Sequence, residues 1–110
     1  MYGTIARLRV KPGSTAKLSE ELAKYPRLKI AGFVTTMLFR MDADADECYL
    51  VVAFKDKETY VANARDPKQD ERYRRVRALL LADPEWHDGE IVWSERAVIL
   101  PASFKVSSMG

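Results

Sequence analysis

Residues 83–93, with the sequence DPEWHDGEIVW, gather three of the rarest side chains in the chain. This stretch holds the only histidine, His87, and both tryptophans, Trp86 and Trp93. Histidine titrates near neutral pH, so His87 is a candidate catalytic base that could remove a proton from a phenol or an enol. The alternative is that His87 lies in a helix-to-strand turn and hydrogen-bonds to the backbone there. The sequence leaves both hypotheses open.

Several aromatic side chains raise a similar choice between a binding site and a packed core. Trp86, Tyr60 and Tyr73 could line a pocket, in which the tyrosine hydroxyls could bind or protonate an oxygen atom of a substrate. The alternative is that they fill the core, with Trp86 closing its end. Trp93 falls in a predicted strand, where it could instead face a partner subunit.

Arg7 is a candidate for either an ion pair or substrate binding. It lies on the first predicted strand, in a sheet that we expect to be covered on both faces. A covered guanidinium requires a carboxylate or a ligand beside it. Arg7 therefore either pairs with an acidic residue, within the chain or across a dimer, or contacts the substrate. Cys48 begins an apolar strand with no base nearby, which predicts an inert thiol.

Composition and charge argue against several classes of function. The formal net charge is +2, and the arginines of residues 71–77 (ERYRRVR) are spread around a helix, so we expect no nucleic-acid partner. No apolar run is long enough to cross a membrane. A single cysteine excludes an internal disulfide and favours a cytoplasmic protein. Because metal-ligand clusters, glycine-rich phosphate loops and serine nucleophile motifs are absent from the sequence, we expect neither a metal nor a cofactor.

Hydrophobic periodicity predicts four strands and three helices. The first strand alternates with a period of two toward its end, and the first helix carries an apolar stripe at spacings of three and four. The expected strands span residues 2–10, 30–41, 48–56 and 90–100, and the expected helices span residues 14–25, 57–64 and 66–82. Asp56 and Asp66 are expected to begin the second and third helices, and Asp88 and Gly89 to turn the chain before the last strand. The second strand is expected to place five side chains on one face, namely Phe33, Thr35, Met37, Phe39 and Met41.

This order of elements predicts an α+β, ferredoxin-like β-α-β-β-α-α-β fold, with helices on one face of a four-stranded antiparallel sheet. The strands are apolar on both faces, however. The third strand places Leu50 and Phe54 on one side and Tyr49 and Val51 on the other. Because helices cover only one face, the sequence predicts a homodimer in which a second copy packs sheet against sheet.

The C-terminal tail, residues 97–110, has the sequence AVILPASFKVSSMG. It is too apolar for a free end and too short for a domain. We expect it to pack on the partner subunit or on the sheet edge, or else to be partly disordered.

The opening YGTIARLRVKPGS, the closing DPEWHDGEIVW and the order of elements together resemble the antibiotic-biosynthesis-monooxygenase-like (ABM) family of dimeric α/β barrels. The resemblance covers a domain of residues 1–96 and rests on fold features rather than on a catalytic motif. It implies a dimer with a small pocket in each subunit, between the sheet and its helices. Members include cofactor-independent oxygenases of polycyclic aromatic phenols, haem-degrading enzymes, aldehyde-modifying enzymes and proteins without an assigned activity.

The haem-degrading branch can be tested on particular residues. The resemblance would require an asparagine on the first strand and a histidine on a helix of the second half to ligate iron. Here the only asparagine is Asn63, late in the short helix, and His87 follows the long helix. Haem degradation is therefore not expected.

Two functions from different classes remain. The first is a cofactor-independent monooxygenase that activates an aromatic phenol, or a related small molecule, by acid–base chemistry. Such an enzyme needs only to deprotonate a substrate that itself reduces oxygen. His87 would be its base, and Trp86, Tyr60, Tyr73 and Arg7 would contact the substrate. The alternative is a non-catalytic dimeric module that binds a small molecule or assembles with a partner. The sequence does not identify the substrate.

Overall fold

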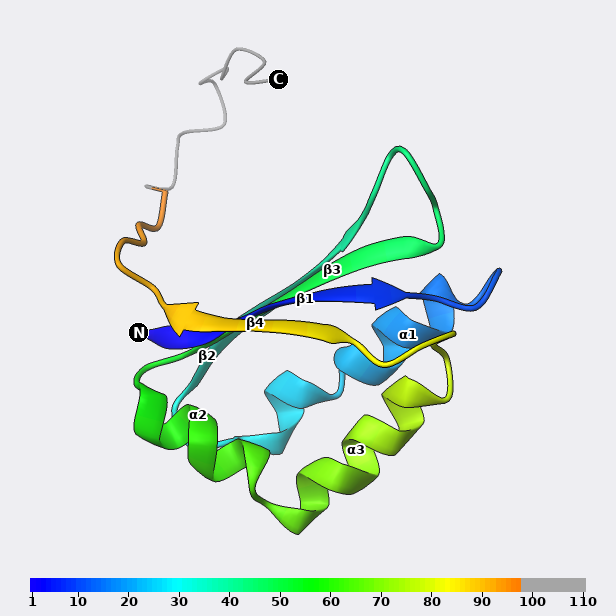
Figure 1. Cartoon of the computed structure of the whole chain (residues 1–110). Coiled ribbons are helices and arrows are strands. Elements are labelled where there is room, and N and C mark those ends of the chain that lie inside the picture. The colour runs from blue at the N-terminus through cyan, green and yellow to red at the C-terminus, as the bar shows by residue number, and fades with distance from the viewer. Residues whose placement is uncertain (98–110) are drawn as a thin grey trace, which may run out of the picture.

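A four-stranded antiparallel sheet with helices on one side forms the domain (Figure 1). The computed structural model describes residues 1–97, so all but the first residue of the predicted tail lies outside the described residues. The sheet order is β2-β3-β1-β4. The elements along the chain are β1 (Tyr2–Arg9), α1 (Thr15–Leu22), the 3₁₀ helix η1 (Tyr25–Leu28), β2 (Phe33–Arg40), β3 (Glu47–Phe54), α2 (Lys57–Ala64), α3 (Pro67–Arg77) and β4 (Glu85–Glu90).

This architecture confirms the predicted α+β ferredoxin-like fold. β1 is central and pairs with β3 on one side and with β4 on the other, both antiparallel. Aspartates begin α2 and α3, as the sequence predicts: Asp56 accepts a hydrogen bond from the Thr59 amide at 2.8 Å, and Asp66 accepts one from the Lys68 amide at 2.9 Å. These side chains satisfy amide groups that have no partner inside the helix.

The fourth strand begins and ends earlier than the sequence predicts. β4 spans Glu85–Glu90 rather than residues 90–100. The prediction followed the apolar residues after Gly89 and interpreted Asp88 and Gly89 as a turn. Instead, Asp88 pairs with Thr4 of β1 inside the strand. β4 is an edge strand whose sequence is mostly polar, so the hydrophobic pattern does not reveal it. Trp93 lies beyond the strand, with 75% of its surface exposed.

The last long helix also ends before residue 82, at Arg77. The chain leaves the helix to join the sheet: Leu80 forms an isolated bridge with Val10, and the Leu81 amide donates to the Arg9 carbonyl at 2.8 Å. This tertiary pairing replaces the helical hydrogen bonds that the local sequence would favour.

A bulge in β2 corrects the predicted face of Phe33. The register shifts between Phe33 and Thr35, which places Phe33 opposite Phe54 on the helical side. Thr35, Met37 and Phe39 remain on the opposite face, as predicted. An extra residue in one strand reverses the alternation that follows it, and the apolar pattern alone does not locate such a shift.

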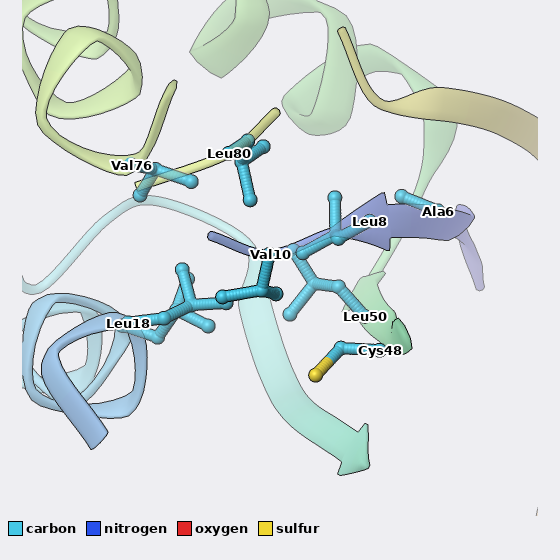
Figure 2. Packing of buried hydrophobic residues seen from close by; sticks show 9 residues of the cluster. Ala6, Leu8, Val10, Leu18, Cys48, Leu50, Val76 and Leu80 are labelled. Atoms are coloured by element: carbon cyan, nitrogen blue, oxygen red, sulfur yellow. The ribbon is translucent and has the colours of Figure 1, made fainter. Parts of the chain in front are cut away.

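The hydrophobic core fills one half of the space between the sheet and the helices. Figure 2 shows its buried side chains from β1, α1, β3 and the end of α3. The cluster consists of Ala6, Leu8, Val10, Leu18, Leu22, Cys48, Leu50, Val76 and Leu80. Burial raises the pKa of the Cys48 thiol, because the thiolate would lose its hydration. This placement agrees with an inert structural thiol.

The other face of the sheet carries large apolar side chains in contact with solvent. Ile5 is 53% exposed, and Met37 and Phe39 are exposed to a similar extent. The predicted two-sided pattern of β3 is confirmed, because Leu50 and Phe54 face the helices while Val51 lies across from Ile5 on the open face. Within residues 1–97, no helix has both the length and the apolar character needed to cross a lipid bilayer.

Leu8 and Leu81 provide a matched test of the core assignment. Leu8 is 1% exposed, whereas Leu81 is 62% exposed. We expect Leu8→Ala to lower the free energy of unfolding by about 2–5 kcal/mol, because it leaves a cavity. Leu81→Ala should change it by less than about 0.5 kcal/mol. Urea denaturation followed by circular dichroism measures both, and equal losses would contradict this core.

Candidate active site

A cavity of about 410 Å³ occupies the other half of the space between the sheet and the helices. Leu22, Leu50 and Val76 separate it from the packed core and line both. Two features leave this half unfilled. First, β1 contributes the small Thr4 side chain to this half, whereas it contributes Leu8 to the core half. Second, as far as residues 1–97 show, α2 contributes no fully buried side chain. The volume lies within the range of small-molecule binding sites.

Thr4 is a buried polar residue in the wall of this cavity. It is 5% exposed, and its hydroxyl has no hydrogen-bond partner among the described residues. On β1 it stands between Val52 of β3 and Asp88 of β4. A buried hydroxyl without a partner costs about 1–3 kcal/mol, and a ligand in the adjacent cavity that hydrogen-bonds to it would remove this cost.

Tyr60 and Asp88 form a hydrogen-bonded pair next to Thr4. The Tyr60 hydroxyl donates to Asp88 Oδ1 at 2.8 Å, joining α2 to β4. Burial raises the pKa of Tyr60 well above its usual value, and the Asp88 carboxylate raises it further. The Thr4 hydroxyl is near enough to Tyr60 to oppose the shift weakly, but the two groups do not have the geometry of a hydrogen bond. Tyr60 is therefore a protonated donor at neutral pH, and its single O–H holds one oxygen of Asp88. The second carboxylate oxygen can accept a hydrogen bond from a ligand.

Aromatic rings provide much of the cavity wall. Phe54 lies edge-to-face with Phe33 and with Tyr60, at centroid separations of 5.8 and 5.6 Å. Tyr73 of α3 and Trp86 of β4 form a second pair at 6.4 Å. Flat apolar walls with few polar groups favour a planar aromatic ligand, because its rings can make offset or edge-on contacts.

The structure brings together three of the five predicted site residues. Trp86, Tyr60 and Tyr73 all line the 410 Å³ cavity. Trp86 does not close the core, since 48% of its surface is exposed. Its exposure leaves the cavity open to solvent along the β4 edge.

His87 lies on the opposite face of the sheet. It follows Trp86 on β4 and stands across from Ile5, where it is exposed. The alternation of side chains along a strand separates His87 from the cavity residues on either side of it. The turn interpretation of His87 is wrong, because the residue is inside a strand. The role of His87 as a base stays a prediction. His87 does not line the cavity, so any such role would belong to the open face of the sheet.

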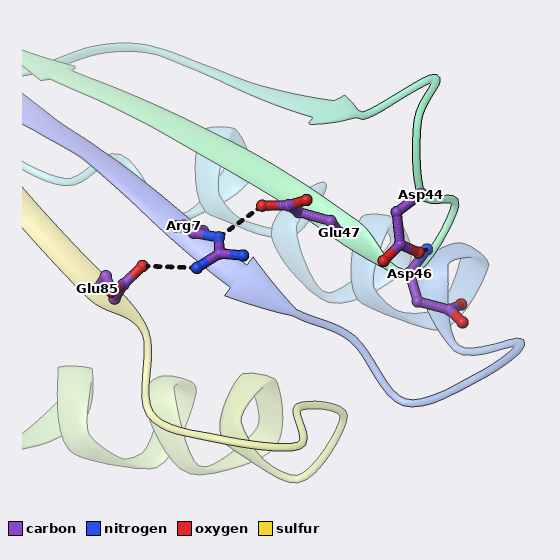
Figure 3. A network of polar contacts seen from close by, with 5 residues as sticks. All are labelled: Arg7, Asp44, Asp46, Glu47 and Glu85. Atoms are coloured by element: carbon purple, nitrogen blue, oxygen red, sulfur yellow. Dashed lines mark hydrogen bonds and ion pairs between the residues drawn. The ribbon is translucent and has the colours of Figure 1, made fainter.

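Arg7 is also on the open face, where it pairs with acidic residues of its own chain. Its Nε contacts Glu47 Oε1, and its Nη1 lies 3.3 Å from Glu85 Oε2 (Figure 3). Both partners raise the pKa of Arg7, Glu47 more strongly. Figure 3 also shows the hairpin turn, in which the Asp44 side chain accepts from the Asp46 amide at 2.9 Å. In residues 1–97, the guanidinium thus has carboxylate partners and does not border the cavity.

Sequence reasoning missed Thr4, Asp88 and Asn63, all of which line the cavity. The sequence did contain a signal for Thr4. Alternation along β1 places it on the same face as Ala6 and Leu8, which predicts a buried polar side chain. Asp88 was hidden by the turn interpretation of Asp88-Gly89. Asn63 carried no local signal, because its position relative to the cavity depends on how α2 packs.

Solved structures share this fold at low sequence identity. A protein of the antibiotic biosynthesis monooxygenase type from Chloroflexus aurantiacus has a TM-score of 0.72 at 21% identity, over 86% of this chain and 96% of that one. One of the same type from Bordetella bronchiseptica has 0.71 at 21%, over 84% and 97%. SnoaB, a cofactor-independent oxygenase from Streptomyces nogalater, has 0.71 at 17%, over 84% and 94%.

These similarities show the ferredoxin-like α+β fold. Curated proteins give no match to the sequence. The sequence profile of the family described as antibiotic biosynthesis monooxygenase matches residues 1–74. The chain therefore belongs to the antibiotic biosynthesis monooxygenase family. The matched region contains Thr4, Tyr60 and Tyr73, whereas β4 with Asp88 follows it.

Replacing Thr4 by valine should stabilise the protein in the absence of a ligand. The change keeps the side-chain shape and removes the unpartnered hydroxyl, so we expect the free energy of unfolding to rise by about 1 kcal/mol. Thr35→Val, on the exposed face of β2, is the matched control and should change it by less than about 0.5 kcal/mol. Urea denaturation gives both values. A loss of stability in Thr4→Val would mean that the hydroxyl has a partner in the folded protein.

Proposed function

We propose that this protein is a cofactor-independent monooxygenase that binds a flat aromatic phenol in the cavity between the sheet and the helices. The observation that carries the proposal is the unpartnered Thr4 hydroxyl beside the Tyr60–Asp88 pair, in a cavity whose walls are otherwise largely apolar. Membership in the family and the fold shared with SnoaB support the reaction class.

The polar groups suit a phenol hydroxyl as ligand. The free oxygen of Asp88 accepts a hydrogen bond from the phenol hydroxyl, and the Thr4 hydroxyl donates one to the phenol oxygen. Tyr60 holds the carboxylate in place through its own hydrogen bond. The aromatic rings of the substrate contact Phe54, Trp86 and Tyr73, and the substrate itself excludes water from the carboxylate.

The carboxylate acts on the proton as the ring is oxidised. A carboxylate and a phenol differ by about six units in reference pKa, or about 8 kcal/mol, so a free phenolate does not accumulate beside it. A phenol that loses an electron becomes a much stronger acid. The proton then passes to Asp88 as the electron passes to oxygen, and the two radicals combine at a ring carbon that bears hydrogen. Asp88 returns its proton to the resulting peroxide anion, which becomes a hydroperoxide. Loss of water from the hydroperoxide gives a quinone, so one phenol and one O₂ yield one quinone and one water.

Asp88 and His87 provide adjacent variants on opposite faces of β4. With 1-naphthol as substrate, we expect Asp88→Asn to lower the rate of oxygen uptake about 10²–10⁴-fold, because the proton acceptor is lost. His87→Ala should retain the wild-type rate. An oxygen electrode measures consumption, and absorbance spectroscopy measures the quinone.

The opposite result would reassign the chemistry. Loss of uptake in His87→Ala with retention in Asp88→Asn would support the histidine and place the reaction on the open face. No uptake by the wild type with 1-naphthol or larger hydroxy-arenes, despite binding, would favour a non-catalytic binding module.

We also propose that the open face of the sheet packs against a second copy of this chain. Strand register places small residues in one row across the sheet, Gly89, Gly3, Ala53 and Thr35, and bulky residues in the next row, His87, Ile5, Val51 and Met37. The small row lies in a hollow of about 310 Å³. A Cβ at Gly3 would stand 1.9 Å from the Val52 carbonyl oxygen, so this position has no room for a side chain. A two-fold axis lets the bulky row of each copy enter the hollow of the other.

A charge at Ile5 tests this dimer. Ile5→Glu would bury a carboxylate in the interface, at a cost of several kcal/mol, so we expect dimerisation to weaken at least about a thousandfold. Leu28→Glu, an exposed position of η1 in the helical layer, is the control and should remain dimeric. Sedimentation velocity at micromolar concentration measures the oligomeric state. A monomeric wild type, or a dimeric Ile5→Glu, would contradict the arrangement.

A further inference from the structure

A second polar group, distant from Asp88, lines the same cavity where η1 faces α3. Tyr25 of η1 and Gln69 of α3 are hydrogen-bonded to each other, and both border the cavity. Arg72 completes the cluster: its Nη1 donates to Gln69 Oε1 at 3.1 Å, and its guanidinium lies 5.9 Å from the centroid of the Tyr25 ring.

The chemistry of these groups fixes the direction of each hydrogen bond. A guanidinium can only donate, so the Gln69 oxygen faces Arg72 and the Gln69 NH₂ faces Tyr25. Because an NH₂ group can only donate as well, the Tyr25 oxygen accepts. The Tyr25 hydrogen is left over, and across residues 1–97 it meets no acceptor. Burial raises the pKa of Tyr25, so this hydrogen is present at neutral pH.

The two polar ends of the cavity therefore have opposite hydrogen-bonding character. The Asp88 end presents a carboxylate oxygen that accepts, while the Tyr25 end presents a hydroxyl that donates. Between Tyr25 and Tyr60 lie the rings of Phe33 and Phe54, in successive contacts of 6.3, 5.8 and 5.6 Å. A planar ligand that extends along these rings meets an acceptor at one end and a donor at the other.

We propose that Tyr25, oriented by Gln69 and Arg72, is a specificity-determining residue that donates a hydrogen bond to a carbonyl oxygen at the end of the ligand remote from its phenol hydroxyl. The ligand class is thus a hydroxy-aryl ketone or hydroxy-quinone rather than a simple phenol. This inference rests on the proposed function only in placing the phenol end at Asp88.

Two ligands that differ only in the carbonyl test the proposal. In 6-hydroxy-1-tetralone the phenol and the ketone lie on different rings, and 5,6,7,8-tetrahydro-2-naphthol is the same molecule without the ketone oxygen. We expect the wild type to bind the tetralone about tenfold more tightly, by one hydrogen bond. In Tyr25→Phe this preference should disappear, so that the two ligands bind with about equal affinity, while the affinity for the tetrahydronaphthol stays that of the wild type. Isothermal titration calorimetry measures both affinities.

Gln69→Glu separates ligand recognition from a purely structural role. A carboxylate at this position accepts the Tyr25 hydrogen and withdraws it from the cavity, while the link between η1 and α3 remains. We expect the preference for the tetralone to be lost and the melting temperature to stay close to that of the wild type. A cluster that only ties η1 to α3 would leave the ratio of the two affinities unchanged.

Three results would overturn the inference: no preference in the wild type, an unchanged preference in Tyr25→Phe, or equal weakening of both ligands in Tyr25→Phe. Failure of the proposed function gives a different pattern. If the tetralone preference depends on Tyr25 while Asp88→Asn leaves oxygen uptake unaltered, Tyr25 recognises the ligand and Asp88 is not the proton acceptor.

Discussion

Backbone pairing between β1 and β4 holds Trp86 opposite Ala6 and Asp88 opposite Thr4, and the cavity depends on this register. A shift by one residue would turn Trp86 and Asp88 to the open face and bring Glu85 and His87 under the sheet. Tyr60 would then lose its partner, and the cavity would lose its acceptor. The short ladder of an edge strand therefore decides which groups the cavity contains.

The pairing of β4 with β1 also places two sets of residues on opposite faces of the sheet. Alternate positions of β4 contribute to the cavity, and the positions between them contribute to the open face. On that face Arg7 is held by Glu47 and Glu85 from neighbouring strands. Because these charges are satisfied within one chain, the apolar rows beside them can pack against another surface without an unpaired guanidinium.

The sequence was sufficient for the fold and for part of the cavity. Alternation at the end of β1, the apolar run of β3 and the aspartates Asp56 and Asp66 predicted elements that the structure confirms. Trp86, Tyr60 and Tyr73 were predicted as pocket residues from their type. The prediction misplaced β4 because this polar edge strand has no hydrophobic alternation of its own. Its position depends on pairing with β1, which is distant in the sequence. The face of Phe33 depended on a bulge, which one sequence does not reveal.

The candidate polar groups could not be assembled from the sequence for a related reason. Thr4, Tyr60 and Asp88 come from three elements widely separated along the chain, and their meeting depends on how α2 packs over the sheet. Tyr25 and Gln69 are separated by 44 positions. The direction of their hydrogen bond follows only when the contact with Arg72 is known.

The division of the helical side into a filled half and a hollow half has a consequence for how such a chain can diverge. Leu8, Val10, Leu18 and Leu80 carry the packing, while the residues that would select a ligand lie largely outside that cluster. Exchanges at the more exposed cavity residues, such as Trp86, remove fewer close contacts than exchanges in the packed cluster, so they cost less of the small free energy that keeps a domain folded. A lineage with this layout can change what it recognises in single steps and keep its scaffold.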